Sequence, residues 1–151
     1  MSPRSITVST VVLTVIAVAL VGYHRKTQQK TASSTEAEAT SKMIEEARVT
    51  AVNNDKFLMV LFGAAWCPDC LELSKKLKDL ITSHRLGRHF VVVNIDVGEF
   101  NRNLSVARAL GVDVTQGIPV AVFFPPSNSV TSVKMGTEQI LTYIKEVIAR
   151  P

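Results

Sequence analysis

Cysteine is scarce in this chain: Cys67 and Cys70 are the only two. A framework of structural disulfides is therefore excluded, and no cysteine near the N-terminus offers a site for lipid attachment. Any thiol chemistry must take place in the short stretch Ala65-Trp66-Cys67-Pro68-Asp69-Cys70.

The chain also lacks a strong excess of charge of one sign. Its formal net charge is +4, and Arg4, Arg25, Lys26 and Lys30 near the start contribute much of it. So weak an excess gives no reason to expect nucleic acid as a partner. With 151 residues, 46% of them hydrophobic and 20% charged, the chain has material for one domain and an appendage.

Charge is missing altogether from Ile6 to Tyr23. A helix of this length covers roughly 27 Å, close to the thickness of a bilayer core. We expect residues 1–26 to form an N-terminal membrane anchor with its flanks, with residues 6–23 as a single transmembrane helix. A cleaved signal peptide and a buried core helix are the alternatives. The pattern Ala17-Val18-Ala19 lies inside the apolar run, and basic residues follow the run at once, so a clean cleavage region is missing.

Residues 27–40 contain no large apolar side chain and are rich in Thr, Ser, Gln, Ala and Glu. Such a segment cannot cover a hydrophobic core, so we expect a flexible linker. A folded domain is expected over residues 41–151.

The pattern of this domain alternates between helices and strands. Apolar runs predict strands at Phe57–Phe62, Phe90–Ile95, Val120–Phe124 and Val130–Met135. Residues at helical spacing predict four helices, the second from Leu71 to near Gly87, and Thr137 is expected to cap the last. The residues expected to face inward are Met43, Ile44, Ala47, Ala51 and Val52 in the first helix, Leu73, Leu77, Leu80 and Ile81 in the second, Leu104, Ala107 and Leu110 in the third, and Ile140, Leu141, Ile144, Val147 and Ile148 in the last.

The order of these elements defines the fold class. It predicts an α/β domain with a mixed central sheet of about four strands flanked by helices. Because a helix joins the first two strands, these strands should be parallel.

The two cysteines stand where the first strand passes into a helix. Backbone N–H groups and the positive end of the helix dipole at that point favour the thiolate of Cys67. A redox pair is the leading hypothesis, with a zinc or copper(I) site and an inert disulfide as alternatives. A closed metal site needs about four ligands, and His24, His84 and His89 are not in positions to supply them. We expect no metal and no other cofactor.

In this setting the chain resembles the thioredoxin superfamily from about Ser41 to Arg150, and membrane-anchored bacterial thioredoxin-like proteins in particular. The resemblance rests on Trp66-Cys67-Pro68-Asp69-Cys70 at a strand-to-helix junction, on Gly117-Ile118-Pro119 before the next-to-last strand, on Gly136 after the hairpin and on the order of the elements. It implies a thioredoxin-like fold.

The resemblance also implies roles for single residues. Pro119 is expected to be cis and to lie beside the dithiol, where the backbone of Ile118 pairs with an extended substrate segment. Cys67 is expected to attack as a thiolate, and Cys70, one turn further in and more buried, to resolve the mixed disulfide. The implied partners are protein disulfide substrates and an unidentified electron donor, and the expected state is a monomer.

Three neighbours of the cysteines are expected to support them. Pro68 fixes φ in the first helical turn. Asp69 places negative charge near Cys67 and disfavours its thiolate, so we expect a reducing pair; an acid in the first turn also interacts well with the helix dipole. Trp66 is expected to be a partly exposed aromatic that shields the dithiol and contacts partners.

Two positions depart from the pattern of typical cytosolic thioredoxins. These proteins have a buried aspartate where this chain has Leu61, and a lysine on the neighbouring strand where it has Val92. The departure puts general-base assistance to Cys70 in doubt, but not the dithiol chemistry, since water can carry the proton.

Two classes of function remain open. The first is a membrane-tethered thiol-disulfide oxidoreductase that reduces or exchanges protein disulfides. The second is a non-catalytic module that holds an extended peptide in the groove at Ile118 and Pro119. The presence of both cysteines favours the first.

The side of the membrane is the remaining question. Arg25, Lys26 and Lys30 follow the apolar run, which favours a cytoplasmic domain. In contrast, an N-terminal apolar segment before a soluble domain usually acts as an export signal. We expect export, with the domain periplasmic or otherwise extracytoplasmic, because a cytosolic dithiol reductase has little need of a tether.

Overall fold

The computed structural model describes residues 34–83, 85–127 and 131–149. The chain divides into two compact units, Met1–Glu36 and Ala37–Pro151. The predicted anchor at residues 1–26 and the first part of the predicted linker lie outside the described residues. In the part of the chain that is described, no helix has both the length and the apolar character needed to cross a bilayer.

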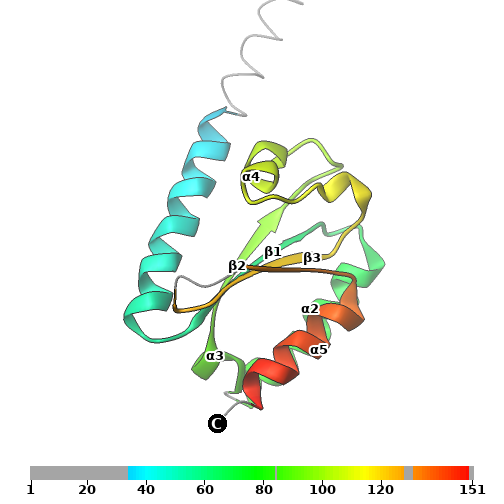
Figure 1. Ribbon diagram of the computed structural model, residues 1–151. Coiled ribbons are helices and arrows are strands. Elements are labelled where there is room, and N and C mark those ends of the chain that lie inside the picture. The colour runs from blue at the N-terminus through cyan, green and yellow to red at the C-terminus, as the bar shows by residue number, and fades with distance from the viewer. Residues whose placement is uncertain (1–33, 84, 128–130, 150–151) are drawn as a thin grey trace, which may run out of the picture. The chain divides into compact units, whose positions relative to one another are not determined.

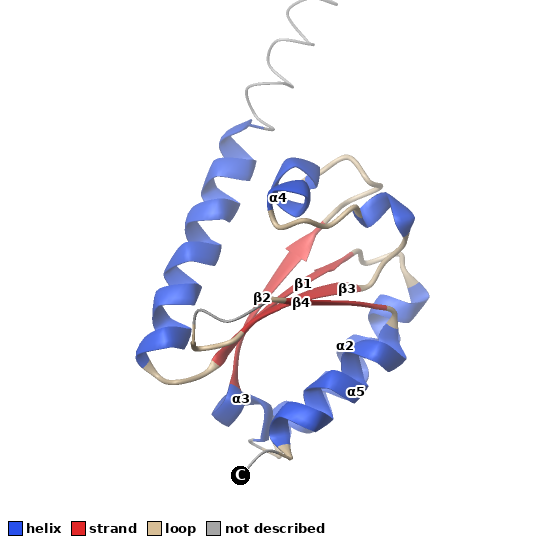
Figure 2. Cartoon of the chain, in the orientation of Figure 1, coloured by secondary structure: helices blue, strands red, loops and turns tan. Residues whose placement is uncertain are grey.

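A four-stranded sheet in the order β2-β1-β3-β4 forms the centre of the second unit (Figure 2). Its strands are β1 (Phe57–Gly63), β2 (Phe90–Asp96), β3 (Val120–Phe124) and β4 (Ser132–Met135). β1 and β2 are parallel, with Leu61 opposite Asn94 and Gly63 opposite Asp96, whereas β3 is antiparallel to both β1 and β4. The mixed sheet and its parallel pair confirm the prediction from the sequence.

Helices cover both faces of this sheet. Among the described residues they are the helix at 34–53, α2 (Pro68–Thr82), α3 (Arg85–His89), α4 (Leu104–Ala109), the 3-10 helix η1 (Val114–Gln116) and α5 (Thr137–Ile148). The helix at 34–53 and α4 lie on one side of the sheet, and α2 and α5 lie on the other (Figure 1).

Strand β1 contributes to both halves of the core because its side chains alternate between the two faces. Val60 and Phe62 pack with residues of the helix at 34–53 and of α4. Met59 and Leu61 pack with residues of α2 and α5. The interior of β1 is buried throughout, so the strand that leads into the dithiol is held by packing on both faces.

The helix at 34–53 includes part of the predicted linker. Residues 34–40 are helical, so the prediction that they are flexible is wrong. Ala37 packs against the core, and Thr40 is buried, with its Oγ1 donating a hydrogen bond to Asn103 Oδ1 over 3.0 Å. Small and polar side chains are enough to hold this part of the helix on the domain, because the helix packs closely against the start of α4.

The inward face of this helix is shifted from the predicted one. Thr40, Ile44 and Ala51 are buried at helical spacing. Met43 and Val52, which the sequence pattern places inward, are 43% and 48% exposed. The prediction of the inward face was wrong because it considered apolar residues only, whereas the buried stripe of the helix contains a threonine.

The second predicted helix is in fact two helices. α2 ends at Thr82, and α3 follows from Arg85 as a separate short helix instead of a continuation to Gly87. Leu73 and Leu77 are buried as predicted, but Ile81 is 55% exposed. The apolar residues of α2 therefore extend beyond the part of the helix that contacts the core.

Thr137 does not cap α5. The N-cap is Gly136, whose φ of 81° suits glycine. Thr137 Oγ1 instead donates a hydrogen bond to the carbonyl oxygen of Asp69 over 3.0 Å, which ties α5 to the first turn of α2. The predicted inward face of α5 is confirmed by the burial of Ile140, Leu141, Ile144 and Val147.

Candidate active site

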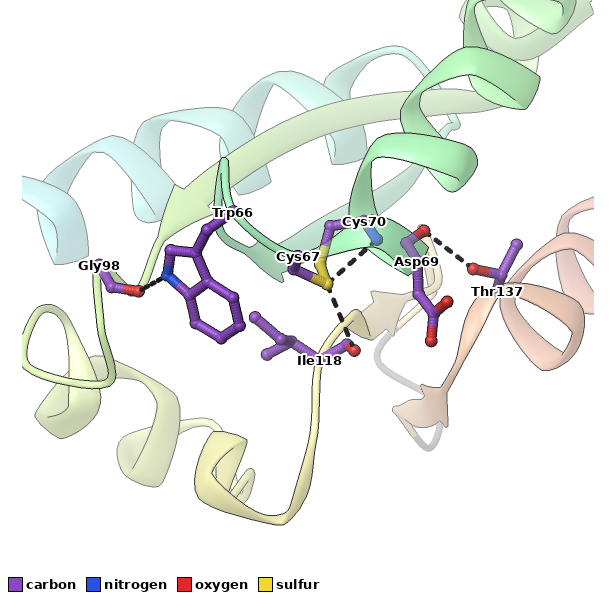
Figure 3. Close-up of a disulfide and its surroundings, with 7 residues drawn as sticks. All are labelled: Trp66, Cys67, Asp69, Cys70, Gly98, Ile118 and Thr137. Atoms are coloured by element: carbon purple, nitrogen blue, oxygen red, sulfur yellow. Dashed lines mark hydrogen bonds between the residues drawn. A yellow bond between two sulfur atoms is a disulfide. The ribbon is translucent and has the colours of Figure 1, made fainter.

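Cys67 and Cys70 are joined by a disulfide where the chain passes from β1 into α2 (Figure 3). Cys67 is the N-cap of α2, and Pro68 stands in the first turn, where its missing N–H removes no hydrogen bond. The backbone N–H of Cys70 donates to Cys67 Sγ over 3.1 Å. In the reduced protein, this N–H and the positive end of a 15-residue helix stabilise negative charge on the Cys67 sulfur.

Both cysteine side chains are buried in this oxidised form, with 4% of Cys67 and 8% of Cys70 exposed. The prediction that Cys70 is the more buried of the two is wrong, because the loop before β3 lies against Cys67. The carbonyl oxygen of Ile118 is 3.7 Å from Cys67 Sγ. A disulfide sulfur carries no proton, so this contact becomes a hydrogen bond only when Cys67 is a thiol.

The loop before β3 brings Ile118 and Pro119 to the dithiol, and the peptide bond between them is cis, as the family resemblance implies. This loop follows η1, whose N-cap is Asp113. Asp113 Oδ1 accepts hydrogen bonds from Thr115 Oγ1 over 2.6 Å and from the Thr115 N–H over 3.1 Å. The hydroxyl of Thr115, followed by its N–H, lowers the pKa of Asp113 from its ordinary value.

Trp66 lies beside Cys67 and is 50% exposed, as predicted for its partly exposed ring (Figure 3). Its Nε1–H donates a hydrogen bond to the carbonyl oxygen of Gly98 over 2.8 Å. Its ring meets Phe100 edge to face, with the ring centroids 5.4 Å apart. Trp66 is thus held by the loop that follows β2.

Asp96 fixes this loop to the end of β2. Its Oδ1 accepts a hydrogen bond from the Gly98 N–H over 3.0 Å, and its Oδ2 forms an ion pair with Arg102 Nη1 over 2.7 Å. The sequence reasoning missed the loop and its role in holding Trp66. The available signal was that a parallel pair of strands ends at one edge of a sheet, which brings the residues after β2 close to those after β1.

An open, largely apolar pocket of ≈ 320 Å³ lies beside Cys70. Leu61, at the position of the family's buried aspartate, forms part of its wall and is 7% exposed. The neighbour of Leu61 on β2 is Asn94, whereas Val92 pairs with Met59. The polar residues in the lining are Ser74, Asn94 and Asp96.

Asp69, the last of the predicted site residues, is exposed in the first turn of α2. No group of three or more His, Cys, Asp and Glu residues is arranged to hold a metal ion within the described ranges. His89 ends α3, whereas His24 and His84 lie outside those ranges.

Comparisons with known proteins agree with this fold. A family model described as thioredoxin-like matches residues 38–126, and the chain belongs to this thioredoxin-like family. Among solved structures, a disulphide isomerase from Xylella fastidiosa Temecula1 is 27% identical with a TM-score of 0.59, and the match covers 72% of this chain and 90% of that one. Chloroplastic thioredoxin z is 28% identical with a TM-score of 0.50, over 70% of this chain and 90% of that one. A poplar thioredoxin h shares the fold at 14% identity, with a TM-score of 0.56 over 73% and 92% of the two chains. A search of curated proteins gives no significant match.

Proposed function

We propose that this protein is a thiol-disulfide oxidoreductase that reduces or exchanges the disulfides of other proteins through Cys67 and Cys70. One observation carries the proposal: Cys67 Sγ lies at the N-cap of α2, 3.1 Å from the Cys70 nitrogen and 3.7 Å from the Ile118 carbonyl oxygen. The first contact favours a thiolate. The second contact brings Cys67 next to the Ile118 backbone, and this proximity supports the proposal that an extended substrate pairs with that backbone. The likeness to a disulphide isomerase and to a thioredoxin supports the same activity.

The reaction has two steps. The Cys67 thiolate attacks one sulfur of the substrate disulfide, the substrate S–S bond breaks, and the other substrate sulfur leaves as a thiolate. Cys70 then loses its proton and attacks Cys67 Sγ, which closes the Cys67–Cys70 disulfide and releases the second substrate thiolate. Two electrons pass from the dithiol to the substrate, so a separate donor must reduce the protein again. In the closed disulfide the two Cα atoms are 5.2 Å apart, within the usual range for disulfides.

Reduction of the substrate is the proposed direction. Asp69 is exposed between the two cysteines, and its negative charge opposes the thiolate of Cys67. A less stable thiolate makes the dithiol a stronger reductant. A reduction potential of the full chain near or above about −150 mV would contradict this direction.

Reduction of insulin tests the activity. With dithiothreitol as electron donor, the full chain should accelerate the precipitation of insulin over dithiothreitol alone. Cys67→Ser should abolish the acceleration because no attacking thiolate remains, and Cys70→Ser should abolish turnover while accumulating mixed disulfide. If both variants keep full activity, the dithiol mechanism is wrong and the peptide-binding module becomes the better account.

We also propose that residues 6–23 tether the catalytic domain to a membrane without cleavage, with the domain on the extracytoplasmic side. The support is the uncharged apolar run from Ile6 to Tyr23 and the lack of a clean cleavage region after it.

A further inference from the structure

Closure of the Cys67–Cys70 disulfide requires that Cys70 lose its proton, because the thiolate is the nucleophile. Leu61 cannot take that proton. We propose, on the basis of the dithiol function above, that Asp96 accepts the proton of Cys70 through water in the pocket beside Cys70. Asp96 is then a proton-relay residue of the resolving step.

The register of the sheet places Asp96 close to Cys70. Asp96 pairs with Gly63 across the parallel strands, so the side chain of Asp96 leaves the sheet on the face where a side chain at position 63 would lie. A Cβ atom at Gly63 would be 3.3 Å from Cys70 Sγ. Because neighbouring strands are about 4.8 Å apart, Cys70 Sγ lies within roughly 8 Å of the Asp96 Cβ. One water molecule bridges two polar atoms that are about 5–6 Å apart.

The lining of the pocket leaves Asp96 as the proton acceptor. Apart from Cys70 itself, Asp96 is the one titratable residue among the lining residues. Ser74 and Asn94 also line the pocket and can hold a water molecule by hydrogen bonds, but neither takes up a proton near neutral pH. The volume of ≈ 320 Å³ far exceeds the space that one water molecule needs.

The charged groups around Asp96 keep its carboxylate in place. Arg102 pairs with Oδ2, and the Gly98 N–H binds Oδ1. Each carboxylate oxygen accepts about two hydrogen bonds, so these two contacts leave acceptor capacity for water. On α2, Asp69 and Glu72 line a different pocket, together with Met135 and Thr137.

The proton of the Cys70 thiol passes through water to the Asp96 carboxylate, and the Cys70 thiolate attacks Cys67 Sγ. The bond between Cys67 and the substrate sulfur breaks, the Cys67–Cys70 bond forms, and the electron pair leaves on the substrate thiolate. Asp96 then returns the proton to solvent through the open pocket.

Stopped-flow reaction of the reduced full chain with dithiobisnitrobenzoate measures the two steps separately. The first release of coloured thionitrobenzoate reports the attack by Cys67, and the second reports the attack by Cys70. Asp96→Asn should leave the first phase within about twofold of wild type and slow the second about tenfold near pH 7. Near pH 10 the second phase should recover, because Cys70 then loses its proton directly to solvent.

Three further variants separate proton transfer from support of the loop. Asp96→Glu keeps a carboxylate and should restore most of the second phase. Asp96→Ser keeps an acceptor for the Gly98 N–H but has no base, so its second phase should be as slow as that of Asp96→Asn. It replaces Asp96→Asn in the test if that variant does not fold. Arg102→Gln breaks the same ion pair but leaves the carboxylate, so its second phase should stay near that of wild type.

The outcomes distinguish this inference from the proposed function. An unchanged second phase in both Asp96→Asn and Asp96→Ser near pH 7 would overturn the relay and leave the dithiol function intact. Equal slowing in Arg102→Gln, without recovery at high pH, would assign Asp96 to the loop alone and also overturn it. The proposed function itself would be contradicted if the wild-type chain showed no second phase that depends on Cys70.

Discussion

At the scale of single residues, Asp69 offers the sharpest test of redox direction. Asp69→Asn removes a negative charge one helical turn or less from Cys67, so the thiolate becomes more stable and the reduction potential should rise by roughly 10–20 mV. Equilibration of the full chain with glutathione buffers measures this shift. Glu72→Gln is the matched control, since Glu72 lies further along α2 and is paired with Lys76 over 2.7 Å. A fall in potential in Asp69→Asn would contradict the electrostatic argument.

Residues of the site differ in how far the sequence could predict them. Cys67, Cys70 and Pro119 belong to motifs whose spacing and neighbours are visible in the chain. Asp96 and Gly98 hold or contact Trp66 only because two strand ends meet at one edge of the sheet. That meeting depends on tertiary structure, which local sequence patterns do not contain.

At the scale of elements, η1 positions the loop that carries Ile118. Asp113→Asn replaces the charged acceptor at its N-cap and should weaken the two hydrogen bonds from Thr115. We expect a KM for insulin about two- to fivefold higher, because the loop is less well ordered, and a first phase with dithiobisnitrobenzoate that is unchanged. Steady-state kinetics and stopped flow check the two parts. An unchanged KM would show that the cap does not position the loop for substrate.

The same variant has a characteristic pH dependence. The pKa of Asp113 is lowered in the folded protein, so its contribution to stability is complete above the ordinary pKa of the carboxyl and is lost as the pH falls through the lowered value. The urea midpoints of wild type and Asp113→Asn should therefore differ at pH 7 and converge once the pH falls below the lowered pKa of Asp113. Glu99→Gln, an exposed carboxylate on another loop, controls for the change in net charge.

Elements were predictable to different degrees for a physical reason. β1 and β3 lie in the middle of the sheet and are apolar on both faces. Their continuous apolar runs therefore predict buried strands with little ambiguity. In the first part of the helix at 34–53, Thr40 donates a hydrogen bond to Asn103 and Ala37 packs against the core. Neither contact leaves a local pattern that separates a helix from a linker.

At the scale of the whole molecule, the proposed tether determines which compartment the dithiol faces. A single span at residues 6–23 places everything after it on one side of the membrane. Alkaline phosphatase fused after Pro151 should be active and green fluorescent protein dark, since each folds on one side only. The same fusions to a chain that lacks residues 1–26 provide the control and should give the reverse result. A dark phosphatase and a bright fluorescent fusion of the full chain would place the domain in the cytoplasm.

Trp66 is the single tryptophan of the chain, and it stands half exposed next to the disulfide. A disulfide accepts an electron from an excited indole ring and quenches its emission, whereas a dithiol quenches far less. Fluorescence of the unlabelled protein should thus brighten on reduction. The indole ring held by Gly98 and Phe100 is in effect an optical probe of the redox state, built into the chain at the place where that state changes.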